Sequence, residues 1–291
     1  MKAAVLGSPV NHSLSPVLHR AAYSALGLAG WSYTAIECDA AALAGLLSGL
    51  DDTWAGLSLT MPLKRAVLAL LDEVEPLAAE VGSANTVIFS RGRGHGYNTD
   101  VGGMVDALAE AGVTACARAL IIGGGATACS ALAALRQIGA REAVVAVRDV
   151  RRADEVKVTA GRLGVGVRVC DLATFDATGG GAGGGAKEFA DSAAHGLVIS
   201  TVPSRAADSA AQWLQAGAFQ PQAVFDVVYD PWPTRLAAAA QAAGSIVIGG
   251  FDLLLHQAAR QVELMTGYRA PLAAMRSAGL AQLAERHVSN A

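Results

Sequence analysis

Residues 118–128 read Arg-Ala-Leu-Ile-Ile-Gly-Gly-Gly-Ala-Thr-Ala, which is an apolar run, a glycine triplet and the start of an apolar helical pattern. This order predicts a buried strand, a sharp turn and a helix. Glycines let the backbone approach a pyrophosphate, and the helix that follows presents free N–H groups to the same anion. With Ala143–Val147 as the next strand, the segment predicts a dinucleotide-binding βαβ unit. A strand-to-helix turn with no role in binding is the alternative that these residues leave open.

Outward from this segment, short apolar runs alternate with helical patterns, which predicts the α/β class with largely parallel sheets. The expected strands are Ala3–Leu6, Tyr33–Cys38, Leu57–Thr60, Leu197–Thr201 and Ala223–Val228, with a hairpin from Thr86–Phe89 through Arg91–Gly94 to Tyr97. The expected helices are Pro16–Leu26, Leu63–Leu71, Val105–Ala111, Thr127–Ile138 and a tail from Phe251 with Leu254, Ala258, Val262 and Met265 along one stripe. The glycine-rich stretch 176–186 predicts a flexible surface loop inside a domain.

The composition is that of a compact two-domain protein with a small-molecule partner. The chain has 291 residues, 53% of them hydrophobic and 16% charged, and a net charge of −3. We therefore expect no binding to nucleic acid or to a membrane. Four cysteines without paired spacing are expected to be reduced, and six histidines without metal-ligand spacing predict no metal site.

The residues after the second strand of the βαβ unit select the cofactor. In such units an acidic side chain there accepts a hydrogen bond from a ribose hydroxyl, whereas arginine favours the 2′-phosphate of NADP. Arg148, Arg151 and Arg152 favour NADP, while Asp149 favours NAD. A solvated basic helix start is the simpler alternative.

Two features near the N-terminus are candidates for substrate chemistry. Ser15-Pro16 predicts a helix start with Ser15 as the N-cap, and Ser13 adds a second hydroxyl where a carboxylate could bind. From spacing alone, a helix entry and a carboxylate site are equally supported. Lys64 is one of only four lysines among 22 basic residues, which suits a titratable role that arginine could not fill.

Four short segments follow one another along the chain: Ser13-Leu14-Ser15-Pro16, Leu59-Thr60-Met61-Pro62-Leu63-Lys64, Gly82-Ser83-Ala84-Asn85-Thr86 and Asn98-Thr99-Asp100. In this order they resemble the shikimate dehydrogenase family, and the Ala- and Arg-rich composition with Asp230-Pro231-Trp232-Pro233 resembles its actinobacterial branch. The resemblance continues through the Gly123 loop, Tyr229, Gly250 and Gln257, and so covers essentially the whole chain.

The resemblance implies a cytoplasmic NAD(P)-dependent oxidoreductase that acts on a CH–OH group. It would reduce 3-dehydroshikimate to shikimate with NADPH, in the biosynthesis of chorismate and the aromatic amino acids. Its fold would be an α/β substrate-binding domain, 1–102 and 250–291, with an inserted Rossmann domain, 103–249, and C-terminal helices returning to the first domain. The chain would be a monomer or a homodimer.

The resemblance also implies roles for individual residues. Lys64 and Asp100 would form the catalytic pair, since a ketone that receives a hydride must be protonated on oxygen. The substrate would be bound by Ser13, Ser15, Thr60, Asn85, Asp100, Tyr229 and Gln257. The cofactor would be bound by Gly123, Gly124, Gly125, Ala126, Thr127, Arg148, Asp149, Arg152, Val227 and Gly250.

The chain departs from the family pattern near the cofactor. Val147 and Asp149 flank Arg148 where the family often has asparagine and threonine, which weakens the preference for NADP over NAD. Three alternatives stay open: an NAD-dependent quinate/shikimate dehydrogenase, a folate-linked dehydrogenase and a non-catalytic dinucleotide sensor.

Overall fold

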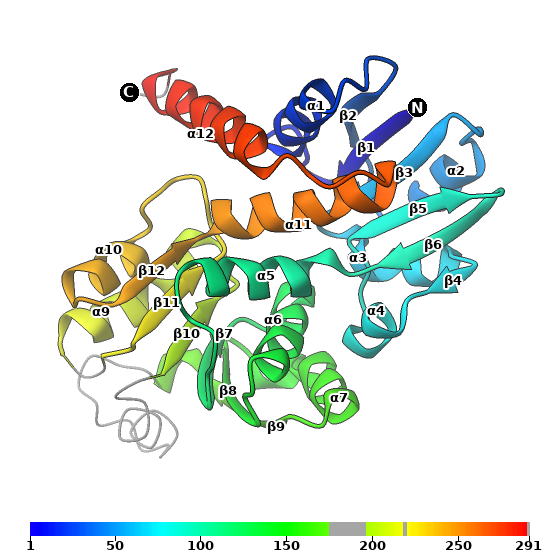
Figure 1. Cartoon of the computed structure of the whole chain (residues 1–291). Helices are drawn as coiled ribbons and strands as arrows, with labels where there is room; N and C mark the ends of the chain where they lie inside the picture. Colours follow the sequence, from blue (N-terminus) through cyan, green and yellow to red (C-terminus); the bar gives the residue numbers. More distant parts are fainter. Residues whose placement is uncertain (175–195, 218–219, 290–291) are drawn as a thin grey trace. The chain divides into compact units, whose positions relative to one another are not determined.

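The computed structural model describes residues 1–174, 196–217 and 220–289 (Figure 1). The glycine-rich stretch 176–186, expected to be a flexible loop, lies outside these residues. The chain divides into two compact units. Unit 1 comprises Met1–Gly103 and Leu254–Ala291, and unit 2 comprises Met104–Leu253. Within the described ranges, no helix has the length and apolar character needed to span a bilayer.

Unit 1 is built on a mixed six-stranded sheet in the order β2-β1-β3-β5-β6-β4. Its strands are β1 (Lys2–Gly7), β2 (Ser32–Glu37), β3 (Trp54–Leu59), β4 (Glu73–Val74), β5 (Thr86–Ser90) and β6 (Arg93–Tyr97). β1 pairs in parallel with β2 and β3, and β5 pairs antiparallel with both β3 and β6. The predicted hairpin is thus confirmed, and it makes this sheet less parallel than expected.

The helices of unit 1 are short except at the chain ends. They are α1 (Ser15–Ala25), α2 (Leu43–Ser48), α3 (Leu63–Ala66), α4 (Pro76–Val81) and α12 (Leu272–Ser289). The expected single helix 63–71 is wrong in detail, because α3 tightens into a 3₁₀ helix over Val67–Leu70. The apolar side of this segment still faces the core, with Leu63 and Val67 fully buried.

Unit 2 contains an all-parallel six-stranded sheet in the order β12-β11-β10-β7-β8-β9. Its strands are β7 (Arg118–Ile122), β8 (Glu142–Val147), β9 (Gly166–Asp171), β10 (Leu197–Ser200), β11 (Ala223–Asp226) and β12 (Ile246–Gly249). Counted from β7, the spatial order is 3-2-1-4-5-6, which is the doubly wound Rossmann arrangement. The predicted βαβ unit is confirmed as β7, α6 (Ala126–Gln137) and β8.

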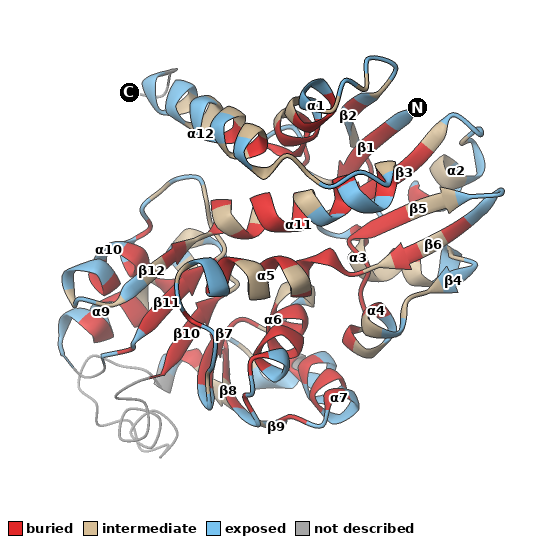
Figure 2. Cartoon of the chain, in the orientation of Figure 1, coloured by how far each residue is buried: buried red, intermediate tan, exposed pale blue. Residues whose placement is uncertain are grey.

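The other helices of unit 2 complete this arrangement. They are α7 (Asp154–Leu163), α9 (Asp208–Gln215) and α10 (Arg235–Ala242), with 3₁₀ helices at Val150–Arg152, Leu172–Thr174 and Ser204–Ala207. The buried Trp213 and Leu214 of α9 pack with Leu236 of α10 in one apolar cluster. Unit 2 therefore has a hydrophobic core of its own (Figure 2).

Two helices carry the chain from one unit to the other. α5 (Thr99–Glu110) leads from unit 1 into unit 2, and α11 (Gly250–Thr266) leads back. The stripe predicted on α11 is buried at Ala258, Val262 and Met265 and half-buried at Leu254. α12 then returns along α1.

Candidate functional site

Lys64 and Asp100 form a close, nearly buried ion pair in unit 1. Lys64 lies in α3, just after β3, and Asp100 lies in the first turn of α5. Lys64 Nζ donates to Asp100 Oδ2 at 2.6 Å, and the two side chains are 16% and 6% exposed. A charge pair so well shielded from water interacts more strongly than one on the surface.

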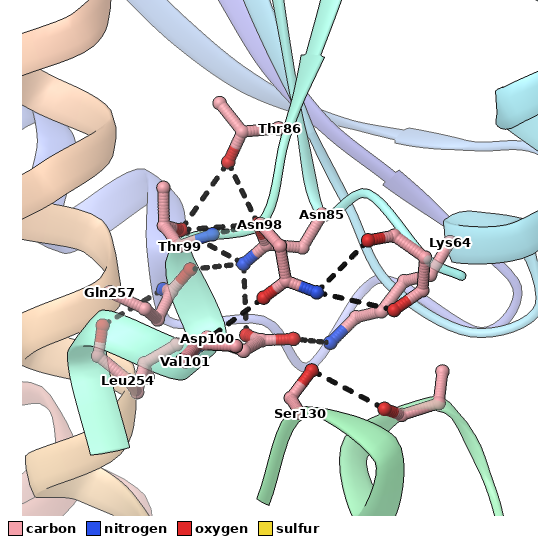
Figure 3. A network of polar contacts seen from close by, with 12 residues as sticks. Lys64, Asn85, Thr86, Asn98, Thr99, Asp100, Val101, Ser130, Leu254 and Gln257 are labelled. Atoms are coloured by element: carbon pink, nitrogen blue, oxygen red, sulfur yellow. Dashed lines mark hydrogen bonds and ion pairs between the residues drawn. The ribbon is translucent and has the colours of Figure 1, made fainter. Parts of the chain in front are cut away.

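Asn85 fixes the other carboxylate oxygen of Asp100. Its Nδ2 donates to Asp100 Oδ1 at 2.8 Å, while its Oδ1 accepts from the Thr99 N–H at 2.8 Å (Figure 3). Because a backbone N–H can only donate, this contact sets which end of the Asn85 amide faces Asp100. Asp100 is therefore held from both oxygens, with Oδ2 towards Lys64.

Gln257 reaches the same group of side chains from α11. Its Oε1 accepts from Asn85 Nδ2 at 3.3 Å, and its Nε2 donates to the Leu254 carbonyl at 2.9 Å. The approach of the two helices requires glycine at 103, where a Cβ would come within 2.8 Å of the Gln257 nitrogen. The structure thus brings Lys64, Asn85, Asp100 and Gln257 together, although they lie on four separate segments of the chain.

Asn98 supports this arrangement from the side. Its Nδ2 donates to the Ser83 carbonyl at 2.9 Å, and its Oδ1 accepts from the Val101 N–H at 3.2 Å (Figure 3). The loop that carries Asn85 is therefore tied to the start of α5, which carries Asp100.

Behind Asn85 runs a buried chain of hydrogen bonds that the sequence did not predict. Thr86 Oγ1 donates to Asn85 Oδ1 at 3.0 Å and accepts from Gln261 Nε2 at 3.0 Å. Gln261 Oε1 in turn accepts from Ser58 Oγ at 2.8 Å. Gln261 is 1% exposed, so each of these bonds is shielded from water.

The far end of this chain holds a buried neutral histidine. His19 Nε2 lies 3.2 Å from Gln261 Oε1, and the His19 ring stacks on Tyr33 at 3.9 Å between centroids. Tyr33 donates to Ser58 Oγ at 2.6 Å. Burial lowers the pKa of His19 to about 3, with the Gln261 contact opposing the shift, so the ring stays uncharged near neutral pH and Nε2 carries the proton.

The two predicted serines lie at the start of α1. Ser13 Oγ accepts from the Ser15 N–H at 3.2 Å, and Ser15 is buried while Ser13 is half-buried. The expectation that Ser15 is the N-cap is wrong, because α1 already begins at Ser15 and the acceptor of its N–H is Ser13. The Ser15 side chain instead interacts with the Tyr33 hydroxyl, which places it beside the buried chain.

Thr60 follows β3, three residues before α3. Its N–H donates to the Leu6 carbonyl at 2.9 Å, and a Cβ at Gly7 would collide with its methyl group. The end of β1 and the Thr60 segment are therefore in close contact.

The predicted glycine turn joins β7 to the N-terminus of α6. Gly123 has φ +119°, and a Cβ there would collide with Thr201 Oγ1, so only glycine fits. Gly125 occupies the N-cap of α6 without a side-chain cap, and Ala126 and Thr127 form its first turn. The first N–H groups of this helix therefore stay available to an anion.

A cavity of about 430 Å³ lies at the carboxyl ends of the strands in the unit 2 sheet. The predicted residues Gly123, Gly124, Arg148 and Asp149 line it. Its remaining lining was not predicted and comprises Ala146, Val147, Leu172 and Val202. Apolar side chains beside a glycine turn and a guanidinium fit a nucleotide with a flat base and a phosphate.

Four further predicted residues belong to unit 2, namely Arg152, Val227, Tyr229 and Gly250. Gly250 is forced to be glycine, because a Cβ would collide with the Val227 carbonyl. Val227 and Tyr229 are half-buried in the segment after β11. The side chain of Arg152 is not among those described.

The four cysteines, all within the described ranges, form no disulfide. Across the described part of the chain, no three His, Cys, Asp or Glu side chains are placed to hold a metal ion.

The doubly wound sheet, its glycine turn and the basic residue at the end of β8 define a dinucleotide-binding α/β protein. The family model for the shikimate dehydrogenase substrate binding domain matches residues 5–87, and that for the shikimate 5′-dehydrogenase C-terminal domain matches 250–278. Shikimate dehydrogenase (NADP(+)) of Moorella thermoacetica is 36% identical over 283 residues, which cover 94% of this chain and 90% of that protein. The chain belongs to the shikimate dehydrogenase family.

Solved structures agree with this assignment. Shikimate dehydrogenase of Mycobacterium tuberculosis superposes with a TM-score of 0.84 at 40% identity, covering 96% of this chain and 99% of that one. Shikimate 5-dehydrogenase of Thermus thermophilus, in complex with NADP(H) and shikimate, gives 0.76 at 32% identity and covers 96% and 98%. The predicted fold class is thereby confirmed.

Proposed function

We propose that this protein is a shikimate dehydrogenase that reversibly reduces 3-dehydroshikimate to shikimate with NADPH. The observation that carries the proposal is the Lys64–Asp100 pair at 2.6 Å, held by Asn85 in a chain that belongs to this family. A non-catalytic dinucleotide sensor would have no need of so well shielded a proton-transfer pair.

The residues of unit 1 supply the acid–base chemistry. Bound NADPH would supply a hydride to the carbonyl carbon. Lys64 Nζ stabilises the negative charge that develops on the carbonyl oxygen and donates its proton there, and it accepts that proton in the reverse direction. Asp100 orients the ammonium group through Oδ2, and Asn85 keeps Oδ2 free for this contact by holding Oδ1.

Substrate recognition follows from the kinds of group present. Ser13 and Ser15, at the positive end of α1, bind the substrate carboxylate, because hydroxyl donors and a helix N-terminus both favour an anion. Thr60, Asn85 and Gln257 bind the ring hydroxyls. The family resemblance adds Tyr229, which belongs to unit 2.

The cavity at the carboxyl end of the unit 2 sheet takes the cofactor. Gly123 to Thr127 would hold the pyrophosphate, with Val227 and Gly250 at the end of β11 and start of α11. Arg148 and Arg152 would bind the 2′-phosphate of NADP, which NAD lacks. We place the enzyme in the cytoplasm as a monomer or homodimer with small-molecule ligands only.

Initial rates with purified protein test the proposal. Shikimate, quinate and a folate substrate are each offered with NADP+ and with NAD+. We expect the highest kcat/KM for shikimate with NADP+. Higher kcat/KM for quinate with NAD+ would assign the chain to the quinate/shikimate branch. Turnover of the folate substrate alone, or of none, would overturn the proposal.

A further inference from the structure

The carboxylate of Asp149 is held by the guanidinium of Arg151. Arg151 Nε donates to Asp149 Oδ1 at 2.9 Å, and Nη2 donates to Oδ2 at 3.1 Å. The Arg151 N–H also donates to Oδ1 at 3.1 Å, so the carboxylate caps the 3₁₀ helix that follows. The contact raises the pKa of Arg151 above its usual value. A two-point pair with an added backbone bond is more ordered than a single-point surface ion pair.

This pair sits where the cofactor is selected. Asp149 lines the 430 Å³ cavity together with Arg148, directly after β8. A carboxylate at this place in a Rossmann unit accepts a hydrogen bond from a ribose hydroxyl and repels a 2′-phosphate. The guanidinium of Arg148 instead attracts the 2′-phosphate. Two adjacent residues with opposite preferences would therefore work against each other.

We propose that Arg151 is a positioning residue that sets cofactor selectivity through Asp149. By holding the carboxylate in an ion pair, Arg151 offsets part of its negative charge and engages both oxygens that would otherwise accept a hydrogen bond from a ribose hydroxyl. Arg148 then determines the preference, and the site takes a nucleotide with a 2′-phosphate. This proposal rests on the proposed function, and it assigns to Arg151 a role different from direct phosphate binding.

The exposure of Arg151 and Asp149 and the lining of the cavity support different roles for Arg151 and Arg148. The Arg151 side chain is 87% exposed and Asp149 is 30% exposed, so the pair extends from the cavity wall towards solvent. Arg151 is absent from the residues that line the cavity, while Arg148 and Asp149 are present. Arg151 is thus placed to act on the carboxylate, and Arg148 is placed to act on the ligand.

A double-mutant cycle tests the proposal. The dissociation constants of NADP+ and NAD+ are measured by calorimetry for the wild type, Arg151→Ala, Asp149→Asn and the double variant, and kcat/KM with shikimate is measured beside them. Arg151→Ala should lower the NADP+/NAD+ preference by roughly 5- to 10-fold, the size expected when a carboxylate a few ångströms from a phosphate loses its counter-charge. In the Asp149→Asn background, the same change should alter the preference by less than about twofold.

The matched control is Arg141→Ala, at the opposite end of β8 from Arg148. It removes the same charge about 20 Å away, at roughly 3.3 Å per strand residue, and should leave the preference unchanged. An unchanged preference in Arg151→Ala would overturn the proposal. So would an equal loss with and without Asp149, because Arg151 would then bind the phosphate itself. Wild-type binding of NADP+ without turnover of shikimate would refute the proposed function alone, and the binding constants would still decide the role of Arg151.

Discussion

At the scale of single residues, the proposed reaction depends on the ammonium group of Lys64. Lys64→Ala should lower kcat by roughly 10²- to 10⁴-fold, the usual contribution of a general acid–base group, and change KM much less. The variant should also unfold at a lower temperature, because Asp100 keeps a nearly buried charge without its partner. Circular dichroism at the assay temperature serves as the folding control. Near-wild-type kcat would remove Lys64 from the mechanism.

His19 should make the stability of the protein sensitive to mildly acidic pH. Its pKa is about 3 in the folded state and about 6.5 when unfolded, so between these values only the unfolded chain binds the proton. The free energy of unfolding therefore falls as the pH drops below about 6.5, by up to about 1.4 kcal/mol per pH unit. Urea titrations at about pH 7 and pH 5 measure the free energy of unfolding of the wild type and of His19→Gln. At pH 7 the variant should be less stable than the wild type. Between pH 7 and pH 5 the variant should lose about 2 kcal/mol less unfolding free energy than the wild type does. Equal losses in both proteins would contradict this prediction.

At the scale of elements, α11 brings two glutamines to the same polar cluster. Gln257 and Gln261 are one turn apart, so they share a face of the helix, and both are buried. Gln257 contacts the Asn85 side chain directly, whereas Gln261 donates to the Asn85 carbonyl at 3.3 Å and reaches the Asn85 side chain through Thr86. The helix therefore supports the Asn85 amide at two points.

Gln261→Met should slow catalysis without removing a group that touches the substrate. Methionine fills the space but cannot donate to Thr86, so Asn85 and with it Asp100 lose part of their support. We expect kcat to fall by roughly 3- to 10-fold, the effect of one buried hydrogen bond, with little change in KM. Ser58→Ala is the matched control, because it removes a donor to the same Gln261 side chain at the end away from Asn85. It should lower the melting temperature but not kcat, and equal kcat losses would mean that Gln261 acts only through stability.

The sequence predicted the elements whose apolar pattern is long or whose turn is marked by glycine, such as β7, α6 and β8. It did not resolve the 3₁₀ continuation of α3, because Val67 and Leu70 are three residues apart, a spacing that lies on one face of either an α-helix or a 3₁₀ helix. It suggested Lys64 from composition, but only the family resemblance linked Lys64 to Asp100, since no periodicity relates residues so far apart. Gln261 was missed because a polar residue in a helix is ordinarily an exposed one. Its spacing of four from Gln257 was the available signal.

At the scale of the whole molecule, the two units differ in how the chain builds them. Unit 2 is one continuous stretch, Met104–Leu253, with its own parallel sheet and its own apolar cluster. Unit 1 needs both ends of the chain, and its cluster around Tyr33 includes Met265 from α11. Unit 2 therefore depends on contacts made within one segment, whereas unit 1 must bring together residues from both ends.

Unit 2 should accordingly fold when residues 104–253 are expressed alone. We expect a single cooperative thermal transition, because a continuous segment that closes its own core meets the requirements for an independent domain. NADP+ at about 100 times its dissociation constant should stabilise the fragment by about 2.7 kcal/mol, and shikimate should have no effect because Lys64, Asp100 and the serines are missing. Arg148→Ala in the same fragment should abolish most of the stabilisation by NADP+ and is the control for specific binding. A fragment that folds but gains nothing from NADP+ would show that the glycine turn and Arg148 do not suffice to bind the cofactor.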